Sequence, residues 1–495
     1  MTRRMLASAA RFAARGPAVL AAGIAVFGAA PVAAGAAEAG VSGCTVTWSG
    51  AGANNSWDNP ANWSTGRVPG SASDVCVSAF VFVSAAGAIS VHSLQIGEES
   101  TIDVGGTGPQ IPSRLSVATT LVNQGNMGVF GSTVDSPVID NTNGIESDRT
   151  STITSPGFSN QGAVAVIDGR LTVPDTPAQL SGGTLSGGTW DATSAGTLVL
   201  PGPVSDLAAG QLVVSGPQSI LAGGHNALAG LAEIGGGARL AVDGGTLPIS
   251  GSLSSQGTLQ LGGYQATGAL TVAGSYTQQR GASAALNGQL QATTISIGAG
   301  SGLQGTGTLA GDVMNDGSVL AGGPLKVTGN YTQAPAAALQ AGQANTTATL
   351  AVTGHAALSG ALHVYVFLPP TPGTRSTAVT FGSRSGNFTS HTIGFRLDTT
   401  STQIQTVATP QIAVTPATAA PGAAVTVNGG DFAYESTVSL HLDTATGTPV
   451  QTAVTDRGGF FQTQLVLPKG TPAGPHTLIA VGTGGRKATA ILHVS

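Results

Sequence analysis

Carboxylates are concentrated in one short stretch of the chain, where they could act in pairs. The stretch contains Asp135, Asp140, Glu146 and Asp148, with Arg149 adjacent. Cleavage of a glycosidic bond needs two carboxyl groups, one as acid and one as base or nucleophile. The alternative is a solvated loop in which Asn and Asp shape turns, and we favour this alternative.

Two further aspartates follow at intervals that suit neighbouring coils of a repetitive β-structure. Asp168 follows Asp140 by about the length of one such coil, and Asp191 follows Asp168 by a similar interval. Strands of neighbouring coils lie about 4.8 Å apart, so side chains at matching positions would meet. Asp140, Asp168 and Asp191 are therefore the candidate catalytic residues.

Other catalytic and ligand-binding patterns are missing from the sequence. It has no G-x-S-x-G elbow, no H-E-x-x-H motif and no P-loop, and its eight His residues lack metal-ligand spacing. The segment Gly300–Gly305 matches the dinucleotide pattern G-x-G-x-x-G, but it lies among strand repeats without the helix that would face a pyrophosphate. We therefore expect no cofactor and no metal.

The composition indicates a repetitive β-protein with weakly charged faces. Gly accounts for 74 of 495 residues, 41% of the residues are hydrophobic and only 8% are charged. Gly, Ser, Thr and Asn supply tight turns, whereas abundant Val, Thr and Ile favour strands. The net charge of −5 and the lack of a basic stripe argue against nucleic acid as a partner.

The segment 1–36 predicts a secretory signal peptide. Four arginines precede an apolar run over residues 17–34, and Ala34-Gly35-Ala36 offers a small-residue cleavage site. Residues 2–6 partly match a twin-arginine signal, and the choice between the two export routes stays open. A membrane anchor is the alternative, but the run is short and rich in Gly and Ala. After cleavage we expect no membrane span.

Two cysteines, Cys44 and Cys76, follow the expected cleavage site. An even pair in an exported protein predicts a disulfide, which would stabilise the fold by about 3–4 kcal/mol in the chain-entropy model. The alternative is a pair of buried free thiols.

Residues 37–79 form a Trp-rich block, in which Trp57 and Trp63 flank a run of Asn, Asp and Pro. This block resembles the Trp-Asn-Pro-Trp segment that precedes β-helical repeats in bacterial surface and autotransporter-like proteins. The resemblance implies a cap that covers the open end of a solenoid. The alternative is a glycan-stacking platform made by Trp57 and Trp63.

Short apolar runs separated by Gly-rich turns fill residues 80–409 and predict stacked strands. The segment Val272–Gln278 returns in similar form as Val327–Gln333, which is typical of an array. The sequence of residues 303–317 and 350–362 resembles that of right-handed parallel β-helices of the passenger and pectin-lyase type. The expected fold class is therefore all-β, with a right-handed parallel β-helix.

Residues 410–495 predict a separate module of about seven strands, divided by turns such as Pro421-Gly422 and Asp456–Gly459. Strings such as Val425-Thr426-Val427 resemble bacterial Ig-like domains, and the resemblance implies an Ig-like β-sandwich. The four expected parts are thus residues 1–36, 37–79, 80–409 and 410–495.

Two functions from different classes fit this organisation. The favoured one is a secreted or cell-surface structural or adhesive protein that binds polysaccharide, cell wall or host surface along its solenoid. The alternative is a polysaccharide lyase or glycoside hydrolase on a β-helix scaffold, with the Ig-like domain as an accessory. The alternative rests on analogy between folds.

Overall fold

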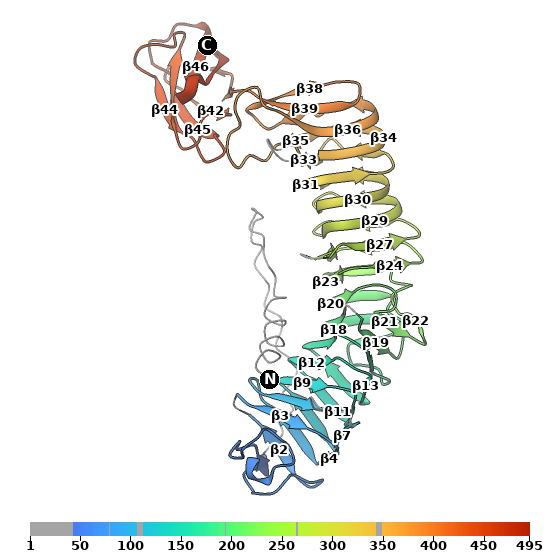
Figure 1. Ribbon diagram of the computed structural model, residues 1–495. Coiled ribbons are helices and arrows are strands. Elements are labelled where there is room, and N and C mark those ends of the chain that lie inside the picture. The colour runs from blue at the N-terminus through green and yellow to red at the C-terminus, as the bar shows by residue number, and fades with distance from the viewer. Residues whose placement is uncertain (1–42, 79, 106–111, 194, 264–265, 343–348) are drawn as a thin grey trace. The chain divides into compact units, whose positions relative to one another are not determined.

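The structure is a computed structural model, and it describes residues 43–78, 80–105, 112–193, 195–263, 266–342 and 349–495. The expected signal peptide and its cleavage site lie outside these residues. The described chain is all-β: a parallel β-solenoid occupies residues 74–363, and a mixed β-sheet region follows it. The solenoid has about 13 turns (Figure 1).

Each of the first coils runs through three strands that belong to three different sheets. Sheet 1 consists of β1 (Val46–Thr47), β2 (Asp74–Val77), β5 (Ser93–Ile96), β8 (Thr120–Asn123), β11 (Val138–Asn141) and β14 (Gly157–Asn160). Sheet 2 consists of β4 (Ala88–Val91), β7 (Arg114–Val117), β10 (Thr133–Asp135), β13 (Ser151–Thr154), β16 (Arg170–Thr172), β19 (Thr197–Leu200), β21 (Ile220–Ala222) and β22 (His225–Asn226).

Sheet 3 begins in the first coil, continues along the whole solenoid and extends beyond it to β39. Its strands are β3 (Phe82–Ala85), β6 (Thr101–Val104), β9 (Asn126–Val129), β12 (Gly144–Ser147), β15 (Ala163–Val166), β17 (Leu180–Ser181), β18 (Thr184–Ala192), β20 (Asp206–Val214), β23 (Glu233–Val242), β24 (Thr246–Ile249), β25 (Leu253–Ser255), β26 (Thr258–Leu261), β27 (Gly268–Val272), β28 (Tyr276–Gln278), β29 (Ser283–Ile297), β30 (Gly302–Asn315), β31 (Ser318–Val327), β32 (Tyr331–Gln333), β33 (Ala338–Gln340), β34 (Thr349–Leu358), β35 (Ala361–His363), β36 (Arg375–Gly386), β37 (Ser390–His391), β38 (Phe395–Thr399) and β39 (Gln403–Ala408).

In-register stacking of apolar side chains forms the core of the solenoid. Successive residues of one inward column are Cα partners in neighbouring strands, and all are buried: Val83, Ile102, Met127, Ile145, Val164, Trp190, Leu212, Leu240, Leu259, Ala284, Leu303, Val319, Leu339 and Leu362. Alternate residues of each strand point outward, because side chains alternate along a strand. The register thus decides which outward side chains meet.

The repeat seen in the sequence corresponds to three coils. Tyr276 pairs with Ile295, Ile295 pairs with Val313, and Val313 pairs with Tyr331. Both tyrosines are buried. The repeated segments therefore occupy the same place on the solenoid, and the interpretation of the repeat as part of a stacked array is confirmed.

The N-terminal block covers the first strands of the solenoid. A disulfide joins Cys44 to Cys76, as the cysteine count predicts, with 5.7 Å between their Cα atoms. The Trp57 N–H donates to the Ser84 carbonyl on β3 (2.9 Å), and Ser84 N–H donates to the Asn55 carbonyl (2.8 Å). These bonds occupy backbone groups that an open end would leave without partners. The block also contains a short 3-10 helix, Pro60–Asn62.

Residues 411–494 form two further sheets. One sheet contains β40 (Gln411–Thr415), β42 (Ala424–Gly430) and β45 (Phe461–Val466). The other contains β41 (Thr418–Ala419), β47 (Lys487–Val494), β46 (Gly474–Val481), β43 (Thr437–Leu442) and β44 (Gln451–Val454). A second 3-10 helix spans Thr483–Gly485. Both sheets contribute to one apolar core around Phe432 and Leu440.

Candidate functional site

The three aspartates chosen from the sequence lie at three different places on the coil. Asp140 is an outward residue of β11 in sheet 1, and its Cα partner on the next coil is Ser159 rather than Asp168. Asp191 is an outward residue of β18 in sheet 3. Asp168 lies in the turn after β15, where its Oδ1 accepts from the Gly169 N–H (2.7 Å). The interval between Asp140 and Asp168 is therefore not one coil, and the structure does not place Asp140 on the face that carries Asp191.

The register places a different set of carboxylates on one face. Asp103 on β6 is the Cα partner of Gly128, and Gly128 is the partner of Glu146 on β12. Glu146 is followed by Ala165 and then by Asp191 in the same outward column. We call Asp103, Glu146 and Asp191 the acidic column. Its members alternate with residues that have a small side chain or none.

Gly128 allows the Asp103 carboxylate to lie close to the sheet. A Cβ atom at Gly128 would lie 2.4 Å from Asp103 Oδ1 and 2.5 Å from the ring of Phe130, so a larger residue there would displace both side chains. The carboxylate is thus partly buried between Gly128 and an aromatic ring. Burial, followed by the negative charges of Glu146 and Asp148, raises the pKa of Asp103 to about 7.

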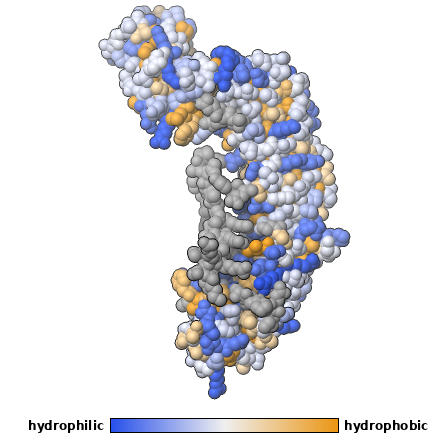
Figure 2. Space-filling view, in the orientation of Figure 1, coloured by the Kyte–Doolittle hydropathy of each residue, from blue (hydrophilic) through white to orange (hydrophobic). Residues whose placement is uncertain are grey.

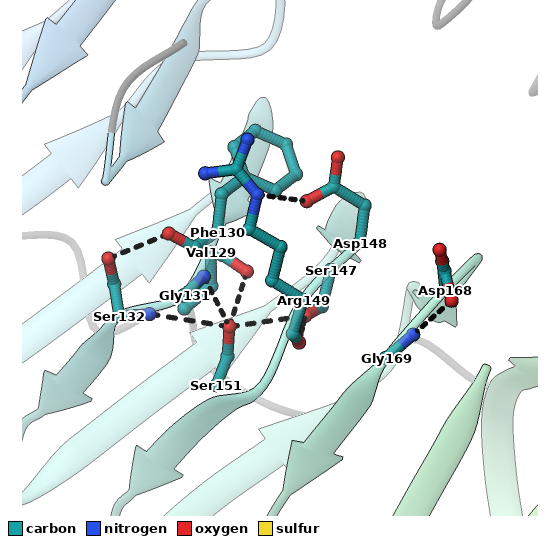
Figure 3. A network of polar contacts seen from close by, with 10 residues as sticks. All are labelled: Val129, Phe130, Gly131, Ser132, Ser147, Asp148, Arg149, Ser151, Asp168 and Gly169. Carbon is teal, nitrogen blue, oxygen red and sulfur yellow. Dashed lines mark hydrogen bonds and ion pairs between the residues drawn. The ribbon is translucent and has the colours of Figure 1, made fainter. Parts of the chain in front are cut away.

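The corner beside the acidic column is held by serine hydroxyls (Figure 3). Ser151 Oγ donates to the Val129 carbonyl (2.8 Å) and accepts from the Gly131 N–H (3.1 Å). Asp148 and Arg149 form an ion pair at the same corner, with 3.7 Å between Oδ1 and Nε. The hydroxyls are bonded to backbone, so their role is to fix the turn.

This arrangement has part of what acid–base chemistry requires. With a pKa of about 7, Asp103 is partly protonated near neutral pH, and Glu146 lies two strands away, about 10 Å by strand spacing. Among the described residues, no group of three or more His, Cys, Asp or Glu could hold a metal ion. The acidic column therefore offers a partly protonated carboxyl group and a second carboxyl group on the same solenoid face.

Asp103 was missed in the sequence although a signal for it existed. Ile102 and Val104 alternate with it, which predicts that Asp103 points outward. The acidic stretch from Asp135 to Asp148 includes Glu146. The coil lengths that bring Glu146 and Asp103 onto one face cannot be predicted from the sequence.

The aromatic residues proposed for glycan stacking are buried. Trp57 is 1% exposed and Trp63 is 2% exposed. The two rings pack edge to face with centroids 4.7 Å apart, and Trp63 Nε1–H donates to the Trp57 carbonyl (2.7 Å). A sugar stacks on an accessible ring face, and neither ring presents one here.

Comparisons with known proteins identify no relative. No family model matches the chain, and no curated protein matches it.

None of the helices among the described residues has the length and apolar character needed to span a membrane.

Proposed function

We propose that the protein is a secreted or cell-surface structural protein that binds glycans or other surface partners through the outer faces of its solenoid and performs no catalysis. The observation that carries this proposal is a long face of polar and mostly uncharged side chains. One outward column of sheet 3 runs through Thr189, Gln211, Arg239, Thr258 and Ser283. The space-filling view shows a solenoid surface of mainly intermediate hydropathy (Figure 2).

The proposal includes two finer features of the fold. The solenoid is right-handed, in keeping with the strong preference of parallel strand connections for that hand. The C-terminal region is an Ig-like sandwich, supported by its three-stranded and five-stranded sheets over a shared core. A module of this kind would serve as a spacer or a second contact surface.

A binding assay tests the proposed function directly. The purified chain is sedimented with isolated bacterial cell walls, insoluble plant and microbial polysaccharides, and a host-matrix preparation, and new reducing ends and unsaturated products are measured in the same tubes. We expect sedimentation without product. If the chain sediments with none of these materials, the proposed function is wrong.

A polysaccharide-cleaving enzyme is the second candidate, and the acidic column is the observation that favours it. If products form, Asp103→Asn and Glu146→Gln should each lower the rate at least tenfold, because each removes one carboxyl group. Asp140→Asn is the matched control, since it makes the same change on another sheet. Equal rates in all three variants would clear the acidic column of a catalytic role.

A further inference from the structure

Exposed aromatic side chains occur together where the chain leaves the last parallel coils. Strand β35 ends at His363, and Leu362 and Val364 are buried. In the irregular segment that follows, Tyr365 is 50% exposed, and Phe367 and Leu368, where the backbone bends, are 59% and 54% exposed. Large apolar side chains exposed this close together in the chain are unusual for a surface without a binding role.

Both ends of this segment are held in place. The Val364 N–H donates to Thr392 Oγ1 (2.8 Å), and the Pro370 carbonyl accepts from Arg486 Nη2 (2.6 Å). Arg486 is itself fixed by the buried carboxylate of Asp431, 2.6 Å from Nη1. Between these ends Val366 packs against an apolar cluster that includes Val364. The two rings are therefore presented by a fixed backbone, which lowers the entropic cost of binding.

The chain segment that carries the rings has few ionisable side chains. Residues 361–374 contain no Asp, Glu, Lys or Arg. The neighbouring coil contributes the amide of Gln340, whose Cα partner is His363. Flat ring faces beside hydrogen-bonding groups suit a ligand with apolar faces and a polar rim, and the absence of charge suits a neutral one.

We infer that Tyr365 and Phe367 form a stacking platform for a neutral polysaccharide. This inference rests on the proposed function and names the ligand class and the place of contact. The sugar rings lie on the two aromatic faces, and Gln340 lies on the adjacent coil opposite His363, two residues before Tyr365. The platform replaces Trp57 and Trp63 as the aromatic contact of the molecule.

Native affinity electrophoresis tests the platform with the full chain. Gels contain hydroxyethylcellulose, galactomannan or dextran, and retardation gives the dissociation constant. We expect retardation of the wild type by at least one of these polysaccharides. The variant Tyr365→Leu/Phe367→Leu should bind at least tenfold more weakly, whereas Tyr365→Phe/Phe367→Tyr should bind within about twofold of the wild type, because it keeps both rings.

The leucine variant separates sugar stacking from general apolar contact. Ile491→Ala and Val466→Ala, which remove exposed apolar groups elsewhere, are the controls and should not alter retardation. The platform is ruled out if none of the three polysaccharides retards the wild type, or if the leucine variant is retarded equally. If the leucine variant is retarded as strongly as the wild type while the wild type sediments with cell walls, the inference fails and the proposed function stands.

Discussion

Two columns of polar side chains run along the first coils of the solenoid, one inside and one outside. Inside, Asn123 Nδ2–H donates to Asn141 Oδ1 (2.7 Å), and Asn141 Nδ2–H donates to Asn160 Oδ1 (2.8 Å). Outside, burial and then the negative charges of Glu146 and Asp148 raise the pKa of Asp103 in the acidic column. An amide both donates and accepts, whereas a carboxylate only accepts. In-register stacking therefore stabilises the first column, whereas burial and like charge disfavour the ionised carboxylate in the second.

Changing one amide of the inner asparagine column into a carboxylate should have the largest effect on stability. In Asn141→Asp the side chain can no longer donate to Asn160 Oδ1 or to the Ala163 carbonyl, and a charge is buried. We expect a loss of about 3–5 kcal/mol at pH 7, the usual result of an uncompensated buried charge. Denaturant unfolding measures the loss, and hydrogen exchange locates it.

Asn143→Asp is the control for this substitution. Asn143 is exposed, lies in the turn that follows the strand and donates to the Gln124 carbonyl (3.0 Å), so the same chemical change should cost much less there. Equal stability of Asn141→Asp and the wild type would show that the stability of the inner asparagine column does not depend on its hydrogen-bond donors.

Removing the charge of Asp103 in the acidic column should stabilise the protein, in contrast to Asn141→Asp. The pKa of Asp103 is about 7 in the folded protein and 3.8 in the reference state, so the folded state binds the proton more tightly. The stability that this group contributes is thus present below about pH 4 and is lost as the pH rises through 7. Asp103→Asn should be more stable than the wild type at pH 8, by at most about 4 kcal/mol, and similar to it at pH 4.

The difference in unfolding free energy between pH 8 and pH 4 is the quantity to compare. Asp140→Asn is again the matched control, because it changes an outward aspartate of sheet 1. If Asp103→Asn keeps the full wild-type pH dependence, the acidic column does not destabilise the protein.

The sequence predicts the inner column better than the outer one. Apolar alternation and turn strings such as Asn123-Gln124-Gly125 are local, so they indicate strands and turns directly. The pairing of outward residues depends on coil length, which varies: the coil that joins Gly144 to its partner Ala163 is shorter than the next one, which joins Ala163 to its partner Thr189. A residue spacing alone therefore could not identify Asp103 and Glu146 as neighbours.

For the aromatic residues too, the sequence predicts the local structure but not which side chains are exposed. The density of Trp in residues 44–76 predicted a structured block, and the disulfide between Cys44 and Cys76 is confirmed. Whether Trp57 and Trp63 lie inside or outside depends on packing against β3, which no local pattern encodes. Tyr365 and Phe367 were not singled out, although their alternation with Val364 and Val366 was visible.

The pair His476 and Asp443 lies outside both columns. It shows how much stability a single polar pair contributes when it is not part of a stacked column. His476 Nδ1 lies 2.7 Å from Asp443 Oδ2, and His476 Nε2 lies 2.9 Å from the Pro472 carbonyl. Both partners are acceptors, so both ring nitrogens donate only when the ring is protonated. The hydrogen bond to Asp443, then that to Pro472, raises the pKa of His476 above 6.5.

The stability from a raised histidine pKa is fully present below pH 6.5 and is lost as the pH rises through the folded value. His476→Gln should therefore be less stable than the wild type at pH 6, and this difference should shrink by pH 9; it should be the smallest of the three effects because the pair is exposed. An NMR titration checks the cause: in Asp443→Asn the pKa of His476 should fall toward 6.5. His225→Gln, on β22, is the control for the stability measurement. A His476 pKa that is unchanged in Asp443→Asn would show that the carboxylate does not hold the proton on the ring.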